Sequence, residues 1–503
     1  MTDIQALKDC LQEITALKQA SALLEWDQQT KMPLRGAGSR ALQSEAISKL
    51  IHELSVSPST AKLLEHAERQ AANLDSDSDD VAFVRVARRD FEKEVRIPTE
   101  LVVEMAGTTS RAHEVWAKAR NDDDYESFAP WLDKIFALTR RVAGHLGFED
   151  CMYDALLDQF EPGMKTAQVS KMYDDLKPRS TALIKKIASV SDRVSDDIVR
   201  RNFDIQGQTR FGERIIKELG YELECGRQDQ AVHPFCTTIG ANDVRITTRY
   251  ERNWLPAALF GSMHETGHAL YELGVADRYH DNILAGGTSL GFHESQSRLW
   301  ENLVGRSLDF WTRHFDELKS TFPETLSDVD IETFYRAINK VSPSLIRVEA
   351  DEVTYNMHTM LRFEIENDLL EERISVAEAP DLWNARMKEY LGVSPAKYSD
   401  GILQDVHWSG GGIGYFPTYT IGNILSVQLF ESAEQQLGAS MSDGLRLGNY
   451  SPLFQWLREN VYQWGRKYDP SELIERITGG PLDANPYLDY LERKYGAIYN
   501  ISV

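Results

Sequence analysis

The stretch MHETGHALYE, residues 263–272, places two histidines four positions apart, with a glutamate directly after the first. On a helix, residues i and i+4 lie on one face, so His264 and His268 can present imidazole nitrogens to a single point. Zinc accepts such nitrogens at ~2.0–2.1 Å and, in catalytic sites, keeps a coordination position for water. Glu265 can reach that water and accept its proton, as in HExxH metallopeptidases. The motif therefore predicts a metal-dependent hydrolase.

A chance match is the alternative interpretation, because the chain holds 12 histidines among its 503 residues. An ordinary structural helix more often carries its histidines singly. Gly267 also counts against an ordinary helix, because a mid-helix glycine costs ~1 kcal/mol and usually marks close packing against a neighbour. The balance favours a metal site.

A third ligand is needed, and spacing alone leaves its identity open. Tyr271 and Gly274 stand where the HExxHxxGxxH pattern would have its glycine and last histidine, so that pattern is absent. After the loop NILAGGTSLG comes a helix-compatible run, FHESQSRLWENLVG, and Glu294 near its start is the first candidate. A second helix crossing the first can deliver this carboxylate, although an acid is also favourable in the first turn of any helix. The rival ligands are His293, Glu301 and His280.

The elements that must position these groups are predicted to be mainly helices. Apolar side chains recur near a 3.6-residue period in several segments. Helices are expected at 4–26, 39–54, 128–146, 292–320, 330–340 and 345–375. Acidic stretches at 74–80 and 120–128 are expected to be solvated loops.

One strand signal lies just upstream of the HExxH motif. Residues 244–250, VRITTRY, are rich in β-branched side chains and alternate in polarity, and residues 233–239 can pair with them as a hairpin. The predicted fold class is mainly α, with a small β-sheet next to the HExxH helix.

Composition restricts the class of protein. The chain is 42% hydrophobic and 26% charged, as is typical of a globular protein with a large core. A net charge of −23 argues against nucleic acid or a membrane surface as partner, because both need a basic footprint. No apolar run approaches the ~18 residues that span a bilayer. The four scattered cysteines are too sparse for a disulfide scaffold, and the N-terminus lacks a signal pattern, so we expect a cytoplasmic protein.

Five short blocks follow one another along the chain: DVRIT at 243–247, HETGH at 264–268, HESQSRLWEN at 293–302, IRVEAD at 346–351 and GILQDVHW at 401–408. Together they resemble the carboxypeptidase Taq family of zinc metallocarboxypeptidases, whose motifs are DxRxT, HExxH, HESQ, (I/V)RxxAD and GxxQDxHW. Weaker similarity covers residues 26–33, 153–164 and 414–419. The resemblance therefore spans nearly the whole chain.

This resemblance implies a zinc ion, one per chain, held by His264, His268 and Glu294, with Glu265 as the catalytic base. It implies a helical body divided by a deep active-site groove, similar to neurolysin and angiotensin-converting enzyme, and a homodimer. We expect one catalytic domain over 1–503, with a helical N-terminal part at about 1–205 and a zinc-site part at about 206–503. Because first-row metal affinities overlap, cobalt can replace zinc.

A carboxypeptidase must recognise a terminal carboxylate, and a fixed guanidinium does so with paired charge-assisted hydrogen bonds. Arg347 in IRVEAD is the first candidate and Arg245 in DVRIT the second. The alternative for Arg347 is a buried ion pair with Asp351, four positions later on one helical face. The strand at 243–250 can also offer an edge whose backbone pairs with a peptide.

The tetrahedral intermediate of peptide hydrolysis needs donors besides the metal. His407 in QDVHW and the tyrosines Tyr415 and Tyr419 are suited to stabilising its oxyanion, although aromatic packing explains either tyrosine equally well. Asp405 is either structural or part of this group. Glu301, two turns after Glu294, can hydrogen-bond a ligand histidine from behind.

The function that these residues and the family resemblance together predict is a zinc metallocarboxypeptidase that removes single amino acids from the C-termini of peptides. Glu265 takes a proton from the attacking water and passes it to the leaving amine. One rival is an oligopeptidase that cuts internal bonds. Another is a helical binding protein with a dead peptidase site, against which the intact glutamate of HETGH argues.

Overall fold

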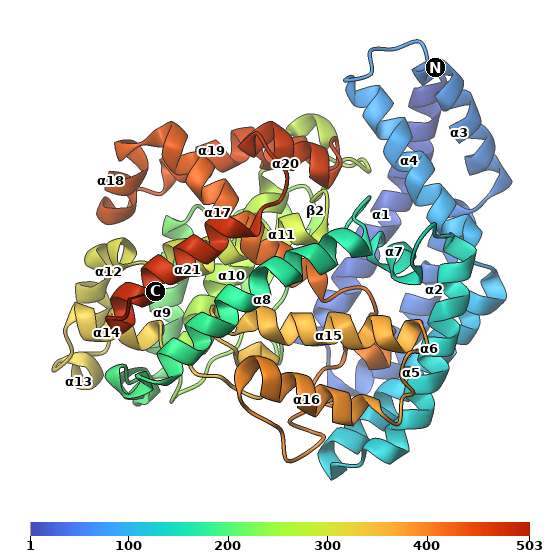
Figure 1. The fold of residues 1–503 in the computed structure, drawn as a ribbon. Helices are drawn as coiled ribbons and strands as arrows, with labels where there is room; N and C mark the ends of the chain where they lie inside the picture. The colour runs from blue at the N-terminus through green and yellow to red at the C-terminus, as the bar shows by residue number, and fades with distance from the viewer. Residues whose placement is uncertain (1, 503) are drawn as a thin grey trace. The chain divides into compact units, whose positions relative to one another are not determined.

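The computed structural model describes residues 2–502 and is mainly helical, as Figure 1 shows. It divides into two compact units, both built from separate stretches of chain. Unit 1 comprises Met1–Val95, Asp196–Ile338 and Ser426–Pro481. Unit 2 comprises Arg96–Ser195, Asn339–Leu425 and Leu482–Val503. The mainly α fold class predicted from the sequence is confirmed.

Unit 1 contains the HExxH segment and the sheet. Its helices are α1 (Asp3–Thr30), η1 (Leu34–Gly36), α2 (Ala37–Ser55), α3 (Pro58–Ala71), α4 (Asp79–Arg96), η3 (Asp197–Arg200), α9 (Ile205–Glu218), α10 (Leu255–Leu273), η4 (Asp277–Tyr279), α11 (Leu290–Arg298), the π-helical η5 (Leu299–Val304), α12 (Leu308–Thr321), α13 (Pro323–Leu326), α14 (Ile331–Ile338), α18 (Ala439–Leu447), α19 (Ser451–Asn460), η8 (Tyr462–Trp464) and α20 (Pro470–Thr478).

Unit 2 contains the IRVEAD and QDVHW segments. Its helices are α5 (Thr99–Asp122), α6 (Tyr125–Leu146), α7 (Met152–Leu157), α8 (Thr166–Ala188), η2 (Ser191–Arg193), η6 (Arg347–Glu349), α15 (Tyr355–Leu370), α16 (Ala379–Leu391), η7 (His407–Gly410) and α21 (Ala484–Tyr499). Helix α17 (Pro417–Leu437) begins in this stretch and ends in unit 1. No helix within residues 2–502 combines the length and the apolar character that a bilayer crossing requires.

The sheet of unit 1 has three strands in the order β1–β3–β2, and it contacts α10. Strand β3 (Asp243–Thr248) pairs antiparallel with β2 (Cys236–Gly240), which confirms the predicted hairpin. It also pairs in parallel with β1 (Gln228–Gln230), which the sequence did not predict. Because β3 lies between two partners, its backbone offers no edge to a peptide, and the prediction of such an edge at 243–250 is wrong.

Helix boundaries follow the predicted pattern with three corrections. The helices expected at 4–26, 39–54 and 128–146 are present as α1, α2 and α6. The prediction of a loop at 120–128 is wrong, because all of these residues except Asp123 and Asp124 belong to α5 or α6. Asp123 has a left-handed φ of 56° and ends α5, while the Asp124 carboxylate accepts the Ser127 amide and starts α6.

The other two corrections concern expected long helices. The helix expected at 292–320 is divided into α11, a π-helical turn and α12. The helix expected at 345–375 begins only at Tyr355, because the chain at Ala350 is extended. These interruptions change where the charged side chains of both segments point.

Candidate active site

Helix α10 carries His264, Glu265 and His268. Pro256 lies in its first turn, where a missing backbone N–H is harmless, and most of the helix is buried between β3, α9 and α11. The rings of His264 and His268 lie on one face, with centroids 5.0 Å apart. The helix is thus apolar on most sides but has two neighbouring imidazoles on one face.

Helix α11 lies against α10 and carries Glu294. Ser289 caps α11 by accepting the Phe292 amide, which fixes where this helix begins. Gly267 is where the two helices touch, because a Cβ there would lie only 2.5 Å from the Gln296 carbonyl oxygen. The mid-helix glycine of HETGH thus allows the approach of the helix that holds Glu294.

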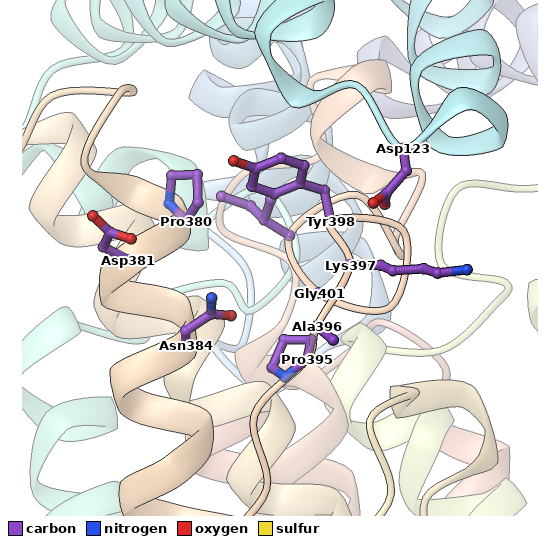
Figure 2. A pocket seen from close by; sticks show the side chains of 10 residues that line it. Asp123, Pro380, Asp381, Asn384, Pro395, Ala396, Lys397, Tyr398 and Gly401 are labelled. Carbon is purple, nitrogen blue, oxygen red and sulfur yellow. The ribbon is translucent and has the colours of Figure 1, made fainter.

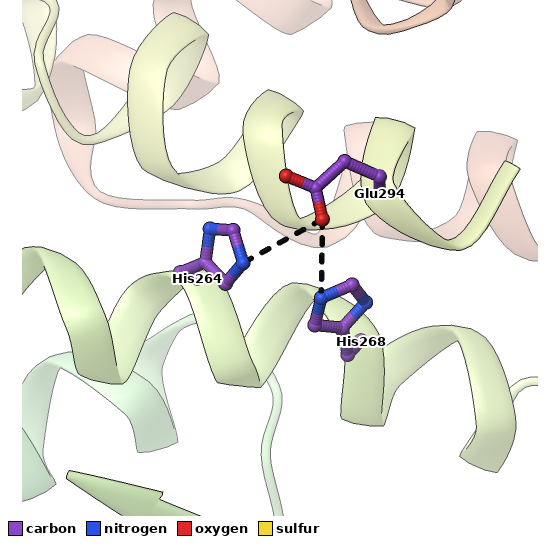
Figure 3. Close-up of side chains that lie close together, drawn as sticks. All are labelled: His264, His268 and Glu294. Atoms are coloured by element: carbon purple, nitrogen blue, oxygen red, sulfur yellow. Dashed lines mark ion pairs between the residues drawn. The ribbon is translucent and has the colours of Figure 1, made fainter. Parts of the chain in front are cut away.

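The structure brings His264, His268 and Glu294 together (Figure 3). The Glu294 Oε2 atom is 3.8 Å from His264 Nε2 and 3.7 Å from His268 Nε2. Donors on a tetrahedral ion with bonds of ~2.0–2.1 Å lie about 3.3 Å apart, so a small contraction suffices to hold one. Two imidazoles and one carboxylate are also one of the donor sets found in catalytic zinc sites. The donors therefore fit a divalent ion, and His280, a weaker candidate, is not part of the group.

Neighbouring charged side chains hydrogen-bond to two of these three donors and orient them. The Nδ1–H of His264 faces Glu301 Oε2 at 2.9 Å, which leaves Nε2 for a metal. Arg298 Nε donates to Glu294 Oε1 at 2.7 Å, and Arg306 lies 3.2 Å from Glu301 Oε1. Burial alone would raise the pKa of Glu301, but His264 and the two guanidinium groups hold it well below its usual range. Glu301 is therefore an anion that orients His264.

Glu265 is buried beside this group, with 6% of its surface exposed. Burial raises its pKa from 4.5 to about 7, helped by the nearby charges of Glu294 and Glu301 and opposed by His264. A dication at the three donors would lower this pKa by direct attraction. Glu265 therefore titrates near neutral pH without an ion, and an ion at the donors would favour its carboxylate form.

Arg347 lies in a second cluster, formed within unit 2. Its Nε and Nη2 donate to Asp405 Oδ1 at 3.1 and 2.9 Å, and its Nη1 donates to the Tyr355 hydroxyl at 2.7 Å. Arg362 donates to Asp405 Oδ2 at 2.6 Å. Although burial opposes it, these two guanidinium groups hold the pKa of Asp405 well below its usual range. Asp405, whose role the sequence left open, is the anion shared by both arginines.

The predicted alternative for Arg347, an ion pair with Asp351, is wrong. Residues 346–351 do not form an α-helix, so the two side chains do not share a face. Asp351 instead accepts backbone N–H groups from Ser342, Val353 and Thr354, just before α15 begins. It organises the chain around Arg347 without pairing with it.

His407 and the two tyrosines lie together in unit 2. The His407 ring is 5.4 Å from that of Tyr415 and 6.4 Å from that of Tyr419, and His407 Nε2 is 3.5 Å from the Tyr419 hydroxyl. The guanidinium of Arg347 lies 4.9 Å from the centre of the Tyr419 ring. Burial and the charge of Arg347 lower the pKa of His407 to about 4, so this imidazole is neutral at pH 7.

Arg245 already has partners of its own in unit 1. Its Nε and Nη2 donate to Asp243 at 2.7 and 2.6 Å, and its guanidinium lies 4.3 Å from the Trp26 ring centre. This arrangement links the DxRxT strand to α1. It favours a structural role over substrate binding.

Three supporting residues were missed by the sequence reasoning. Arg298 is four positions after Glu294 and three before Glu301, so helical spacing could have found it. Arg362 had no local signal, because it meets Asp405, 43 positions away, only through tertiary packing. Arg306 meets Glu301, five positions earlier, across the π-helical turn that the sequence did not predict. Unit 2 also contains a separate pocket of about 250 Å³. Its lining includes Asp123, Asn384 and Tyr398 (Figure 2) and none of the predicted site residues.

Comparison with known proteins gives consistent results along the whole chain. The family model described as "Carboxypeptidase Taq (M32) metallopeptidase" matches residues 6–495. A "Thermostable carboxypeptidase 1" of Thermus thermophilus is 41% identical over 505 residues, which cover 98% of each chain. The crystal structure of an M32 carboxypeptidase from Deinococcus radiodurans is 40% identical, with a TM-score of 0.95 over 99% of this chain and 100% of that one. A Pyrococcus furiosus carboxypeptidase structure is 37% identical, with a TM-score of 0.93 over 98% of this chain and 99% of that chain.

Proposed function

The chain belongs to the carboxypeptidase Taq (M32) metallopeptidase family and is a metallocarboxypeptidase, and on that premise we propose that it uses one zinc ion, bound by His264, His268 and Glu294, to remove single residues from peptide C-termini. The observation that carries this proposal is the convergence of the three donor atoms within 4.8 Å of one another. Cobalt is expected to replace zinc, because the same donors suit both ions.

Glu265 is the proposed general base. A zinc ion, when bound, supplies a Lewis acid that polarises the scissile carbonyl and acidifies water. The Glu265 carboxylate accepts a proton from the attacking water and then donates it to the leaving amine. Burial raises the pKa of this carboxyl to about 7, and an ion at the three donors would lower it, so the carboxylate form that accepts the proton is available at neutral pH.

Arg347 is the proposed receptor for the terminal carboxylate. A guanidinium has five N–H donors, and three nitrogens of Arg347 already donate to Asp405 and Tyr355. Nη1 and Nη2 of this guanidinium each carry a second hydrogen, so two N–H donors remain for the carboxylate of a peptide. Asp405 fixes the plane of the guanidinium and so reduces the ordering needed on binding. Arg245 remains a weaker candidate because of its contacts with Asp243 and Trp26.

His407, Tyr415 and Tyr419 are proposed to stabilise the oxyanion. Neutral His407 has one N–H, and both tyrosines have hydroxyl donors, as this role requires. We also propose a cytoplasmic setting, which the sparse cysteines support, and the homodimer that the family resemblance implies.

Replacement of Glu265 by glutamine tests the mechanism. Because glutamine cannot take up the proton, kcat on blocked dipeptides should fall at least ~10²-fold, while the protein retains one zinc ion. Exposed Glu332 on α14 provides the control, and Glu332→Gln should leave kcat unchanged. Full activity of zinc-loaded Glu265→Gln would refute the proposal.

C-terminally amidated peptides test the reaction class. A carboxypeptidase that requires the terminal carboxylate should stall on them, and Arg347→Lys should raise KM for the free-acid peptides, because lysine cannot form the paired bonds. Internal cleavage of the amidated peptides would instead identify an oligopeptidase.

A further inference from the structure

His293, the first residue of HESQ, lies behind the proposed ligands rather than among them. Its Nδ1 is 2.9 Å from His268 Nδ1, and its Nε2 is 2.5 Å from Glu272 Oε1. Its ring lies 5.0 Å from that of His268. His293 therefore joins a ligand imidazole of α10 to a carboxylate at the end of the same helix.

The direction of these two hydrogen bonds follows from the metal-binding geometry. His268 Nε2 faces Glu294, so this nitrogen must keep its lone pair for an ion. A neutral His268 then carries its proton on Nδ1 and donates it to His293. His293 Nδ1 must accept, so its own proton is on Nε2 and is donated to Glu272. This arrangement satisfies all three groups at once.

The surroundings hold the His293 ring in this orientation. The ring of Tyr271 lies 5.1 Å away, and a Cβ at Gly287 would come within 2.7 Å of the imidazole, so only glycine fits there. The Gly287 amide also donates to Glu272 Oε1, and the Thr238 hydroxyl donates to Oε2 at 3.0 Å. Glu272 is thus fixed as an acceptor by groups outside the helix.

The two proposed histidine ligands are therefore supported differently. His264 donates directly to the carboxylate of Glu301, whereas His268 reaches Glu272 only through a second imidazole. Partners of this kind orient a ligand and raise its basicity, and their loss lowers metal affinity by roughly 10–100-fold.

We propose that His293 is a positioning residue for the metal: it accepts the Nδ1 proton of His268, links it to Glu272, and so fixes the tautomer and orientation in which His268 binds the ion. This inference rests on the proposed function, because it takes His268 as a ligand. His293, which the sequence left open as a possible metal ligand, is thereby given the role of orienting one.

Two substitutions separate the two bonds of His293. In His293→Asn the amide oxygen replaces Nδ1 and still accepts from His268, whereas in His293→Gln the amide nitrogen replaces Nε2 and can reach only Glu272. Full-length protein is stripped of metal and titrated with Zn²⁺ and Co²⁺ against a competing chelator, and the visible d–d spectrum of the Co²⁺ forms is recorded. Thermal unfolding of the metal-free variants monitors folding. His280→Asn is the control, since His280 is outside the ligand group.

We expect His293→Gln to bind both metals roughly 10–100-fold more weakly than wild type, with an altered Co²⁺ spectrum. His293→Asn should recover most of the affinity, and His280→Asn should match wild type. Equal affinities for all variants, or equal losses in the asparagine and glutamine variants, would overturn the inference. Failure of the proposed function is a separate result, in which wild-type protein itself binds no metal.

Discussion

Replacement of Gly267 by alanine tests whether the contact between α10 and α11 controls the metal centre. A Cβ at this position would lie 2.5 Å from the Gln296 carbonyl oxygen and 2.6 Å from the Ser297 Cα. Ordinary contacts of this kind are ~3.5 Å, so α11 must move away by about 1 Å. Glu294 lies two residues before Gln296 on the same helix and moves with it.

The expected effect on the metal is larger than the effect on folding. Overpacking costs ~1–3 kcal/mol, and the better helix propensity of alanine offsets ~1 kcal/mol of this. The free energy of unfolding of the metal-free protein should therefore fall by about 2 kcal/mol or less. Metal–ligand distances tolerate only about 0.2 Å, so a displaced Glu294 should weaken metal binding at least ~10-fold.

Chelator competition measures the affinity, and denaturant unfolding of metal-free protein measures the stability. Gly212→Ala in the middle of α9 is the matched control, because a Cβ there meets nothing within 4 Å. This control should keep wild-type affinity and gain up to ~1 kcal/mol of stability. Wild-type affinity in Gly267→Ala would show that α11 absorbs the change without moving Glu294, and the reasoning would be refuted.

Three further predictions concern the charged groups. Asp405→Asn should lower the free energy of unfolding by about 3 kcal/mol, because it leaves two buried guanidinium groups without their anion, whereas Asp368→Asn at an exposed pair should change it by less than ~1 kcal/mol. Between pH 4 and 6.5, His407 binds fewer protons in the folded than in the unfolded protein, so the free energy of unfolding should fall by roughly 3 kcal/mol as the pH decreases through this window. Denaturation curves recorded over this pH range should show a smaller fall for His407→Gln. At a metal concentration 1,000 times Kd, metal binding should stabilise the folded wild-type protein by about 4 kcal/mol, so chelation should lower its thermal midpoint. Calorimetry of His268→Ala should detect no such change on chelation.

Local spacing predicted the elements of the site better than it predicted their contacts. The apolar period identified α1 and α6, and the pairing of β2 with β3 followed from alternation and a turn. HExxH placed two imidazoles on one face because the i to i+4 relation is fixed within a helix. These features depend on residues that are close in the sequence, and so the sequence was enough to predict them.

Partners distant in sequence were not readable in this way. Arg347 meets Asp405, which is 58 positions away, and the expected pair with Asp351 failed because the chain between them is not helical. The choice of Glu294 over its rivals needed the family motif, since only the packing of α11 on Gly267 decides which carboxylate faces the imidazoles. The π-helical turn that follows α11 was equally hidden, although it carries Glu301.

The charges around the three proposed metal donors bear on the proposed role of Glu265 as the base. Arg298 occupies one oxygen of Glu294 and leaves the other for an ion, so the ligand set offers a dication two neutral imidazoles and a single, partly neutralised carboxylate. A bound ion would then keep a net positive charge in a buried site, where its field is weakly screened. That field would oppose the burial that raises the pKa of Glu265 to about 7. An additional, unpaired carboxylate among the ligands would weaken the field and raise the pKa of Glu265, so the pairing of Glu294 with Arg298 favours the ionised form that accepts the proton of water.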